Sequence, residues 1–156
     1  MVETVGGRCL FVADLGELNR ALAELPAYAS AKKIVSLVPG AGQDNVNLDT
    51  VDDPHKLADV DFAILPGQFG VAENGAVWVT DSGVRHRAIY VLTQHLALVI
   101  PAEQIVDNLH QAYERLTFPG PGFGCFISGP SKTADVEQCL VIGAHGPRSL
   151  TVFCQS

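Results

Sequence analysis

The stretch that decides the fold is SGPSKTADVEQCLVIGAHGPRSL, residues 128–150, which directly follows an apolar run ending at Ile127. Gly129-Pro130 ends the preceding strand, and Ser131 or Thr133 then stands where a side-chain oxygen caps a helix. The stretch therefore predicts a strand followed by the N-terminus of a helix. Such a terminus has free backbone N–H groups and the positive end of the helix dipole, which together bind carboxylates and phosphates.

This predicted helix start has two interpretations. In the first, the hydroxyl groups of Ser128, Ser131 and Thr133 join the backbone N–H groups in binding a small anion. In the second, Asp135 and Glu137 complement the helix dipole themselves, and no ligand is needed. Residue chemistry alone favours the second interpretation.

Apolar runs alternate with amphipathic segments along most of the chain. Residues 8–13 form a short apolar run, and Asp14 is placed to cap a helix that continues through Tyr28 with leucines at helical spacing. We expect further strands at residues 33–38, 62–65, 95–100, 139–142 and 150–154, a helix at 102–116, and a loop at 39–53. This alternation predicts an α/β fold with a mostly parallel sheet flanked by helices.

A second polar group lies in a predicted hairpin within residues 71–80. Asn74-Gly75 is a favoured hairpin turn, and it would hold the carboxylate of Glu73 at its rim. Open parallel sheets bind ligands beyond the carboxyl ends of their strands, where we expect the Ser128 turn to lie. There Glu73 would act as a base, a nucleophile or an anchor. A solvent-facing residue beside a turn explains Glu73 equally well.

Histidines and arginines provide the remaining candidates. His145 precedes Gly146-Pro147 at a strand-end turn, where its imidazole can be exposed and point back toward the Ser128 loop. His95 opens an apolar strand, where it is either a ligand contact or a core histidine. Arg85 and Arg87 either supply the counter-charge for a carboxylate or belong to a solvated turn.

Composition restricts the classes of function. A chain of 156 residues with 47% hydrophobic content should form one domain with a sizeable core. The net charge of −7 argues against nucleic acid and anionic membranes as partners. With neither a membrane span nor a signal peptide predicted, we expect a cytoplasmic protein. The four cysteines lie in apolar runs without Cys-x-x-Cys spacing, so we expect buried thiols, no metal site and no cofactor in this chain.

Two motifs indicate a family. Ser-Gly-Pro-Ser-x-Thr-Ala-Asp-x-Glu at residues 128–137, followed by an apolar run and Gly-x-His-Gly-Pro at residues 143–147, resembles the C-terminal signature of the LUD domain family of lactate utilization proteins. The order and spacing of segments are similar over residues 8–155, and the family also has a histidine at the place of His95. The resemblance implies a fold like that of the ribose-phosphate isomerase and CoA-transferase group. It also implies a cytoplasmic component of L-lactate to pyruvate oxidation, with iron–sulfur clusters on partner proteins.

The resemblance leaves two rival functions. Ala72-Glu73-Asn74-Gly75 also resembles the motif that carries the nucleophilic glutamate of CoA-transferases, which implies acyl or CoA transfer through Glu73. A third hypothesis is a non-catalytic sensor of small anions. Residues 1–156 are expected to form a single LUD-like domain that lacks the helical N-terminal segment common in the family, and the oligomeric state, a homo-oligomer included, is left open. The catalytic candidates are Glu73 and His145, and the expected contacts of a small carboxylate or phosphate are Asn74, Gly75, Arg87, His95, Ser128, Gly129, Ser131, Thr133, Asp135 and Glu137.

Overall fold

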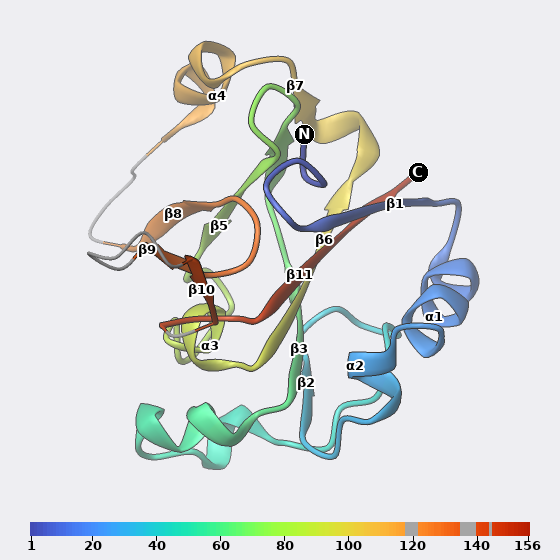
Figure 1. Ribbon diagram of the computed structural model, residues 1–156, viewed down its shortest axis with the longest axis vertical. Helices are drawn as coiled ribbons and strands as arrows, with labels where there is room; N and C mark the ends of the chain where they lie inside the picture. Colours follow the sequence, from blue (N-terminus) through green and yellow to red (C-terminus); the bar gives the residue numbers. More distant parts are fainter. Residues whose placement is uncertain (118–121, 135–139, 144) are drawn as a thin grey trace.

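A parallel sheet forms the centre of the molecule in a computed structural model that describes residues 1–117, 122–134, 140–143 and 145–156 (Figure 1). Its strands follow the order β1-β11-β6-β3-β2, and each neighbouring pair is parallel. The strands are β1 (Arg8–Val12), β2 (Ile34–Ser36), β3 (Phe62–Pro66), β6 (His95–Pro101) and β11 (Ser149–Gln155). This arrangement confirms the predicted α/β fold with a mostly parallel sheet.

Two smaller sheets accompany the central one. A four-stranded sheet has the order β7-β4-β5-β8, and β9 pairs with β10 in a separate antiparallel ribbon. Their bounds are β4 (Phe69–Val71), β5 (Ala76–Thr80), β7 (Ile105–Val106), β8 (Gly124–Ile127), β9 (Lys132–Ala134) and β10 (Leu140–Ile142). The predicted hairpin at Asn74-Gly75 joins β4 to β5, and Gly75 adopts the positive φ of 66° that the turn requires. This prediction is confirmed.

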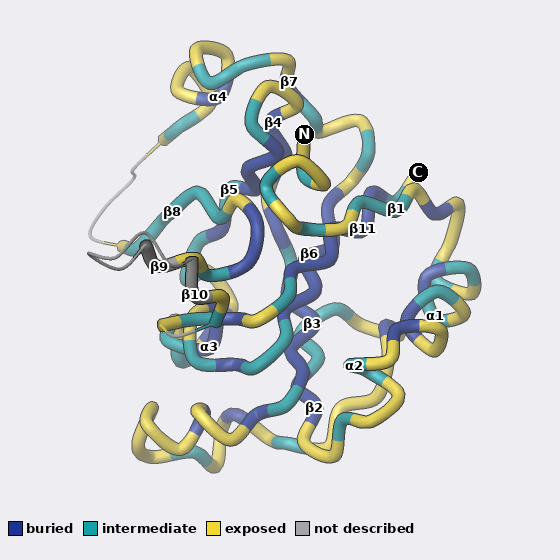
Figure 2. The backbone as a smooth tube through the Cα atoms, in the orientation of Figure 1, coloured by how far each residue is buried: buried dark blue, intermediate teal, exposed yellow. Residues whose placement is uncertain are grey.

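The two faces of the central sheet are covered differently. Helices α1 (Leu15–Ala23) and α2 (Pro26–Ala29) cover one face, where Leu18 and Leu22 pack against Phe62 and Phe153. The other face packs against the four-stranded sheet, α3 (Ile89–Leu92) and the 3₁₀ turns η1 (Leu48–Thr50) and η2 (Pro54–Asp59). The turn η3 (Ala102–Gln104) precedes β7, and α4 (Leu109–Arg115) follows it. The buried residues therefore run along β3, β6 and β11 in Figure 2.

The start of α1 has the predicted cap. Asp14 accepts a hydrogen bond from the backbone N–H of Glu17 at 2.8 Å, and the Glu17 carboxylate accepts one from the N–H of Ala13 at 2.8 Å. This reciprocal pair satisfies two N–H groups at the helix end. The predicted continuation to Tyr28 is wrong, because α1 ends at Ala23 and a second short helix begins at Pro26. Proline has no N–H to donate to the preceding turn and fits best at the first helical position.

Two further helix predictions differ from the structure. The segment 102–116 is helical in its last part, since η3 and β7 precede α4, which begins after the cap residue Asn108. No helix begins at Ser131, because the chain enters β9 instead. The N–H of Ser131 donates to the carbonyl of Pro147 at 2.8 Å, and its carbonyl accepts from the N–H of Gly143 at 2.9 Å. Both backbone groups are thus used between chain segments, so the predicted helix N-terminus at Ser131 is wrong.

Candidate functional site

Apart from Arg87, the described part of the predicted contact set falls into three places. The first is the turn at Glu73 to Gly75, where the hydroxyl of Ser128 donates to the carbonyl of Asn74 at 2.8 Å. N-terminal residues cover this turn, because a Cβ atom on Gly75 would lie 2.6 Å from the backbone nitrogen of Val2. Gly129 is crowded in the same way, since its Cβ would lie 2.5 Å from the carbonyl oxygen of Val5. These glycines make room for the chain's own backbone.

Glu73 belongs to this turn, and its carboxylate caps the N-terminus of α4. Its carboxylate accepts a hydrogen bond from the N–H of Leu109 at 2.9 Å, and its own N–H donates to the carbonyl of Asp107 at 2.9 Å. Leu109 is the first residue of α4, so the negative charge lies at the positive end of that helix. The contact explains why a carboxylate occupies this position of the hairpin.

The second place is the pair of turns around Ser131 and His145. Gly146 lies against Ser131, because a Cβ atom on Gly146 would lie 3.0 Å from the Cβ of Ser131. His145, which is exposed, immediately precedes Gly146 in the sequence. The N–H of Arg148 donates to the carbonyl of Gln94 at 2.8 Å, which places these turns at the amino ends of β6 and β11. The expectation that they lie beyond the carboxyl ends is wrong. Asp135 and Glu137 lie outside the described residues, as does the side chain of Thr133.

The third place is a cavity at the amino ends of the central strands. Its volume is about 330 Å³, and it lies between the sheet and the start of α2. Nδ1 of His95 is 2.8 Å from the hydroxyl oxygen of Ser149, and the imidazole stacks on Phe62 with ring centroids 6.3 Å apart. Thr151, a residue that is only 5% exposed, also lines the cavity. His95, Phe62 and Ser149 each open their strand, so the parallel registry brings them together.

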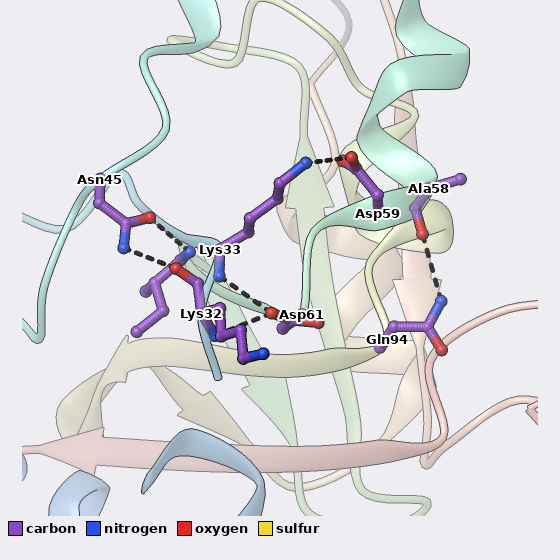
Figure 3. Close-up of polar contacts among 8 residues, drawn as sticks. Lys32, Lys33, Asn45, Ala58, Asp59, Asp61 and Gln94 are labelled. Atoms are coloured by element: carbon purple, nitrogen blue, oxygen red, sulfur yellow. Dashed lines mark hydrogen bonds and ion pairs between the residues drawn. The ribbon is translucent and has the colours of Figure 1, made fainter. Parts of the chain in front are cut away.

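Polar contacts fix the loops that enter these strand ends (Figure 3). The carboxylate of Asp61 accepts hydrogen bonds from the N–H groups of Lys32 and Lys33 at 2.8 and 2.9 Å, and these bonds lower the pKa of Asp61. The side chain of Gln94 donates to the carbonyl of Ala58 at 3.2 Å. The loops before β2, β3 and β6 are thereby joined, which holds the cavity edge in place.

The charges around the cavity favour an anion. Burial lowers the pKa of His95, and the nearby Arg148 lowers it further, while Asp61 opposes both effects. The imidazole is therefore neutral at neutral pH. Arg8 lines the cavity, and the amine of Lys132 lies 3.4 Å from the position of a Cβ on Gly6, another lining residue. Arg8, Arg148 and Lys132 thus lie near the cavity together with one opposing carboxylate, Asp61, in a chain whose net charge is −7.

Arg87 lies elsewhere. Its side chain is exposed, and its guanidinium lies over the ring of Phe123 at 5.2 Å from the centroid. Arg85 pairs with Asp49 at 3.7 Å. Arg87 therefore packs on an aromatic ring, and Arg85 has an ion-pair partner.

The sequence points to His95 but not to Ser149, Thr151, Arg8 or Arg148. A usable signal was present, because His95 and Ser149 both begin apolar runs, and residues that open neighbouring parallel strands share one edge of the sheet. Within the described ranges, no three His, Cys, Asp or Glu side chains are grouped to hold a metal ion. Nor does any helix in the described part of the chain have the length and apolar character needed to cross a membrane.

The chain is similar in structure to a DUF162 family protein from Deinococcus radiodurans, with a TM-score of 0.71 over 99% of this chain and 92% of that chain at 16% sequence identity. That likeness defines an α/β protein of the same fold. Residues 41–153 match the family model of the LUD domain, and the chain therefore belongs to the LUD domain family. This confirms the family resemblance, while the likeness to ribose-phosphate isomerases and CoA-transferases stays a prediction.

Curated relatives point the same way. The chain is 36% identical over 92 residues to lactate utilization protein C of Shouchella clausii, covering 56% of this chain and 40% of that protein. It is 31% identical over 115 residues to lactate utilization protein C of Geobacillus kaustophilus, covering 70% of this chain and 45% of that protein. The uncharacterized protein YkgG of Escherichia coli is 31% identical over 94 residues, covering 54% and 39%. The matched region thus spans less than half the length of these relatives.

Proposed function

We propose that this chain is a cytoplasmic component of a lactate utilization system that oxidises L-lactate to pyruvate, and that the His95 cavity binds the small carboxylate. The relatives named lactate utilization protein C support the role in lactate utilization. The observation that carries the binding site is the 2.8 Å contact between His95 and Ser149 in a cavity lined by Arg8. Any iron–sulfur cluster of the system belongs to partner proteins in this proposal.

The chemistry of the cavity suits a carboxylate. The hydroxyl of Ser149 and an N–H of His95 are donors, while Arg8 and Arg148 supply positive charge. A bound carboxylate also favours the protonated imidazole, which opposes the effect of burial on the pKa of His95. Binding should therefore be accompanied by proton uptake and should strengthen as the pH falls below the ordinary histidine pKa of about 6.5.

Calorimetric titration with lactate, pyruvate and phosphate tests the site. Ser149→Ala removes one hydrogen bond to a charged ligand and should weaken carboxylate binding by about 1.5–3 kcal/mol, or roughly 10- to 150-fold. His95→Gln should weaken binding and abolish the proton uptake. The matched control is His110→Gln, because His110 is exposed on α4 and makes no hydrogen bond in the described part of the chain. The site assignment fails if none of the three anions binds at millimolar concentration. It also fails if the Ser149→Ala variant binds these anions as tightly as the His110→Gln control.

The alternatives differ in what they need from the chain. Acyl or CoA transfer needs Glu73 as a nucleophile, and no observation favours it, because that carboxylate already accepts the N–H of Leu109. A non-catalytic sensor would bind the anion in the same cavity without turnover. Incubating the chain with lactate and an artificial electron acceptor, with and without cluster-containing partners, separates the sensor from the oxidation system.

A further inference from the structure

Two thiols lie in contact on the far side of the sheet from α1. Cys9 on β1 and Cys154 on β11 have their sulfur atoms 3.7 Å apart. Both line a cavity of about 390 Å³, whose other walls include the apolar side chains of Ile100, Ile105 and Val152. This cavity is separate from the one at His95 and plays no part in the proposed lactate chemistry.

The strand register keeps this pair from forming a disulfide. Cys9 is opposite Val152 and Cys154 is opposite Phe11, so the two cysteines are offset by two residues on neighbouring parallel strands. A strand spacing of about 4.8 Å and a rise of about 3.3 Å per residue put their Cα atoms about 8 Å apart. Disulfides need Cα atoms within roughly 7 Å. The backbone therefore holds the pair as two thiols that touch without being able to bond.

The burial of the two thiols and the residues beside them restrict which ligand the pair can bind. Burial raises the pKa of Cys154 to about 12, with the neighbouring Cys9 adding to the effect. The Cys154 thiol is thus protonated and unreactive toward electrophiles at neutral pH, but an ion that bonds strongly to sulfur displaces such protons. Zinc needs four ligands, and the described residues offer no third histidine, cysteine or carboxylate beside the pair. Soft ions that accept few sulfur ligands remain.

We propose that Cys9 and Cys154 form a two-sulfur site for a soft monovalent metal ion of the Cu(I) class. Two metal–sulfur bonds of about 2.3 Å in line need sulfur atoms about 4.6 Å apart, so one side chain must move by roughly 1 Å. Cys9 can do so, because it is only partly buried and lies on β1, the edge strand of the sheet. The exposed side of Cys9 also gives the ion a path from solvent and hydrates the remaining charge of the pair.

Titration of Cu(I) into the reduced protein without oxygen, against a coloured Cu(I) chelator, tests the site. A Cys125→Ser/Cys139→Ser background keeps only the proposed pair, and we expect it to bind one Cu(I) per chain. Adding Cys9→Ser to this background should weaken binding by more than the roughly 100-fold that loss of an outer-shell partner can cause. Cys154→Ala should weaken binding in the same way. If the substitution at the buried Cys154 prevents folding, the result for Cys9→Ser decides the test.

Three results would overturn the proposal. The first is loss of Cu(I) from the Cys125→Ser/Cys139→Ser background, which would assign the ion to the other cysteines. The second is unchanged Cu(I) binding after Cys9→Ser in a variant with the same thermal denaturation curve as its parent. The third is a Cys9–Cys154 disulfide after treatment with a thiol oxidant, found as a loss of two hydrogen masses, because the register argument would then be wrong.

Discussion

Replacing Glu73 with glutamine separates a helix cap from a reacting carboxylate. The structure shows this exposed carboxylate accepting the N–H of Leu109 at 2.9 Å at the start of α4. Glutamine keeps the length and an acceptor oxygen but loses the charge, so the variant should lose the dipole interaction, about 0.3–1 kcal/mol. For a chain of this size that corresponds to a melting temperature lower by about 1–4 °C. Glu73→Ala also deletes the acceptor and should cost about 0.5–2 kcal/mol, as loss of a cap does.

Urea and thermal denaturation of both variants provide the measurement. The matched control is Glu103→Gln, since no hydrogen bond or ion pair is found for the Glu103 side chain among the described residues. It should change the free energy of unfolding by less than about 0.5 kcal/mol. Lactate affinity should be unchanged in Glu73→Gln, because the His95 cavity does not include this residue. A Glu73→Gln protein that unfolds like the wild type but loses a measurable acyl-exchange activity would refute the cap and support the nucleophile.

Three other changes have expected results. Asp14→Ala removes the cap of α1 and should lower the free energy of unfolding by about 0.5–2 kcal/mol in urea denaturation, whereas wild-type stability would show that Glu17 alone holds the helix end. Gly124→Ala places a Cβ 2.3 Å from Cζ2 of Trp78 and should cost about 1–3 kcal/mol with a shift in tryptophan fluorescence; an unchanged spectrum and stability would contradict that packing. The pKa of His95 is lowered in the folded chain, so the unfolded chain takes up a proton first and stability should fall as the pH drops below about 6.5 toward the folded-state pKa. His95→Gln should reduce this dependence of the free energy of unfolding on pH. An equally steep dependence in the variant would show that other groups cause it.

The sequence predicts the central sheet well, for physical reasons that particular residues illustrate. Runs such as residues 62–65 and 96–100 are apolar at every position because both faces of a parallel strand are buried. The cap at Asp14 and the turn at Gly75 are also predicted correctly, since each depends on interactions within a few residues. Local chemistry thus decides these elements without help from the rest of the chain.

The predictions fail where distant backbone groups compete for the same atoms. Ser131 has the side chain of a helix cap, but Pro147 takes its N–H, and that partner is sixteen residues away. Helix spacing in 102–116 is similarly overridden where β7 pairs with β4. The contact between His95 and Ser149 is missed for a related reason: these residues meet because β6 and β11 are neighbours in register, and that pairing must be known before the two strand starts can be placed together.

The position of β11 has a consequence for biosynthesis. It lies between β1 and β6, and residue 8 is opposite residue 151, so β1 has its partner strand only after the chain between them has been made. At elongation rates of about 5–20 residues per second, β1 waits several seconds or longer with an exposed edge. During that time an aggregating chain or a chaperone can pair with it instead. Slow translation between β1 and β11 should therefore lower the yield of folded protein more than the same delay before β1 is made.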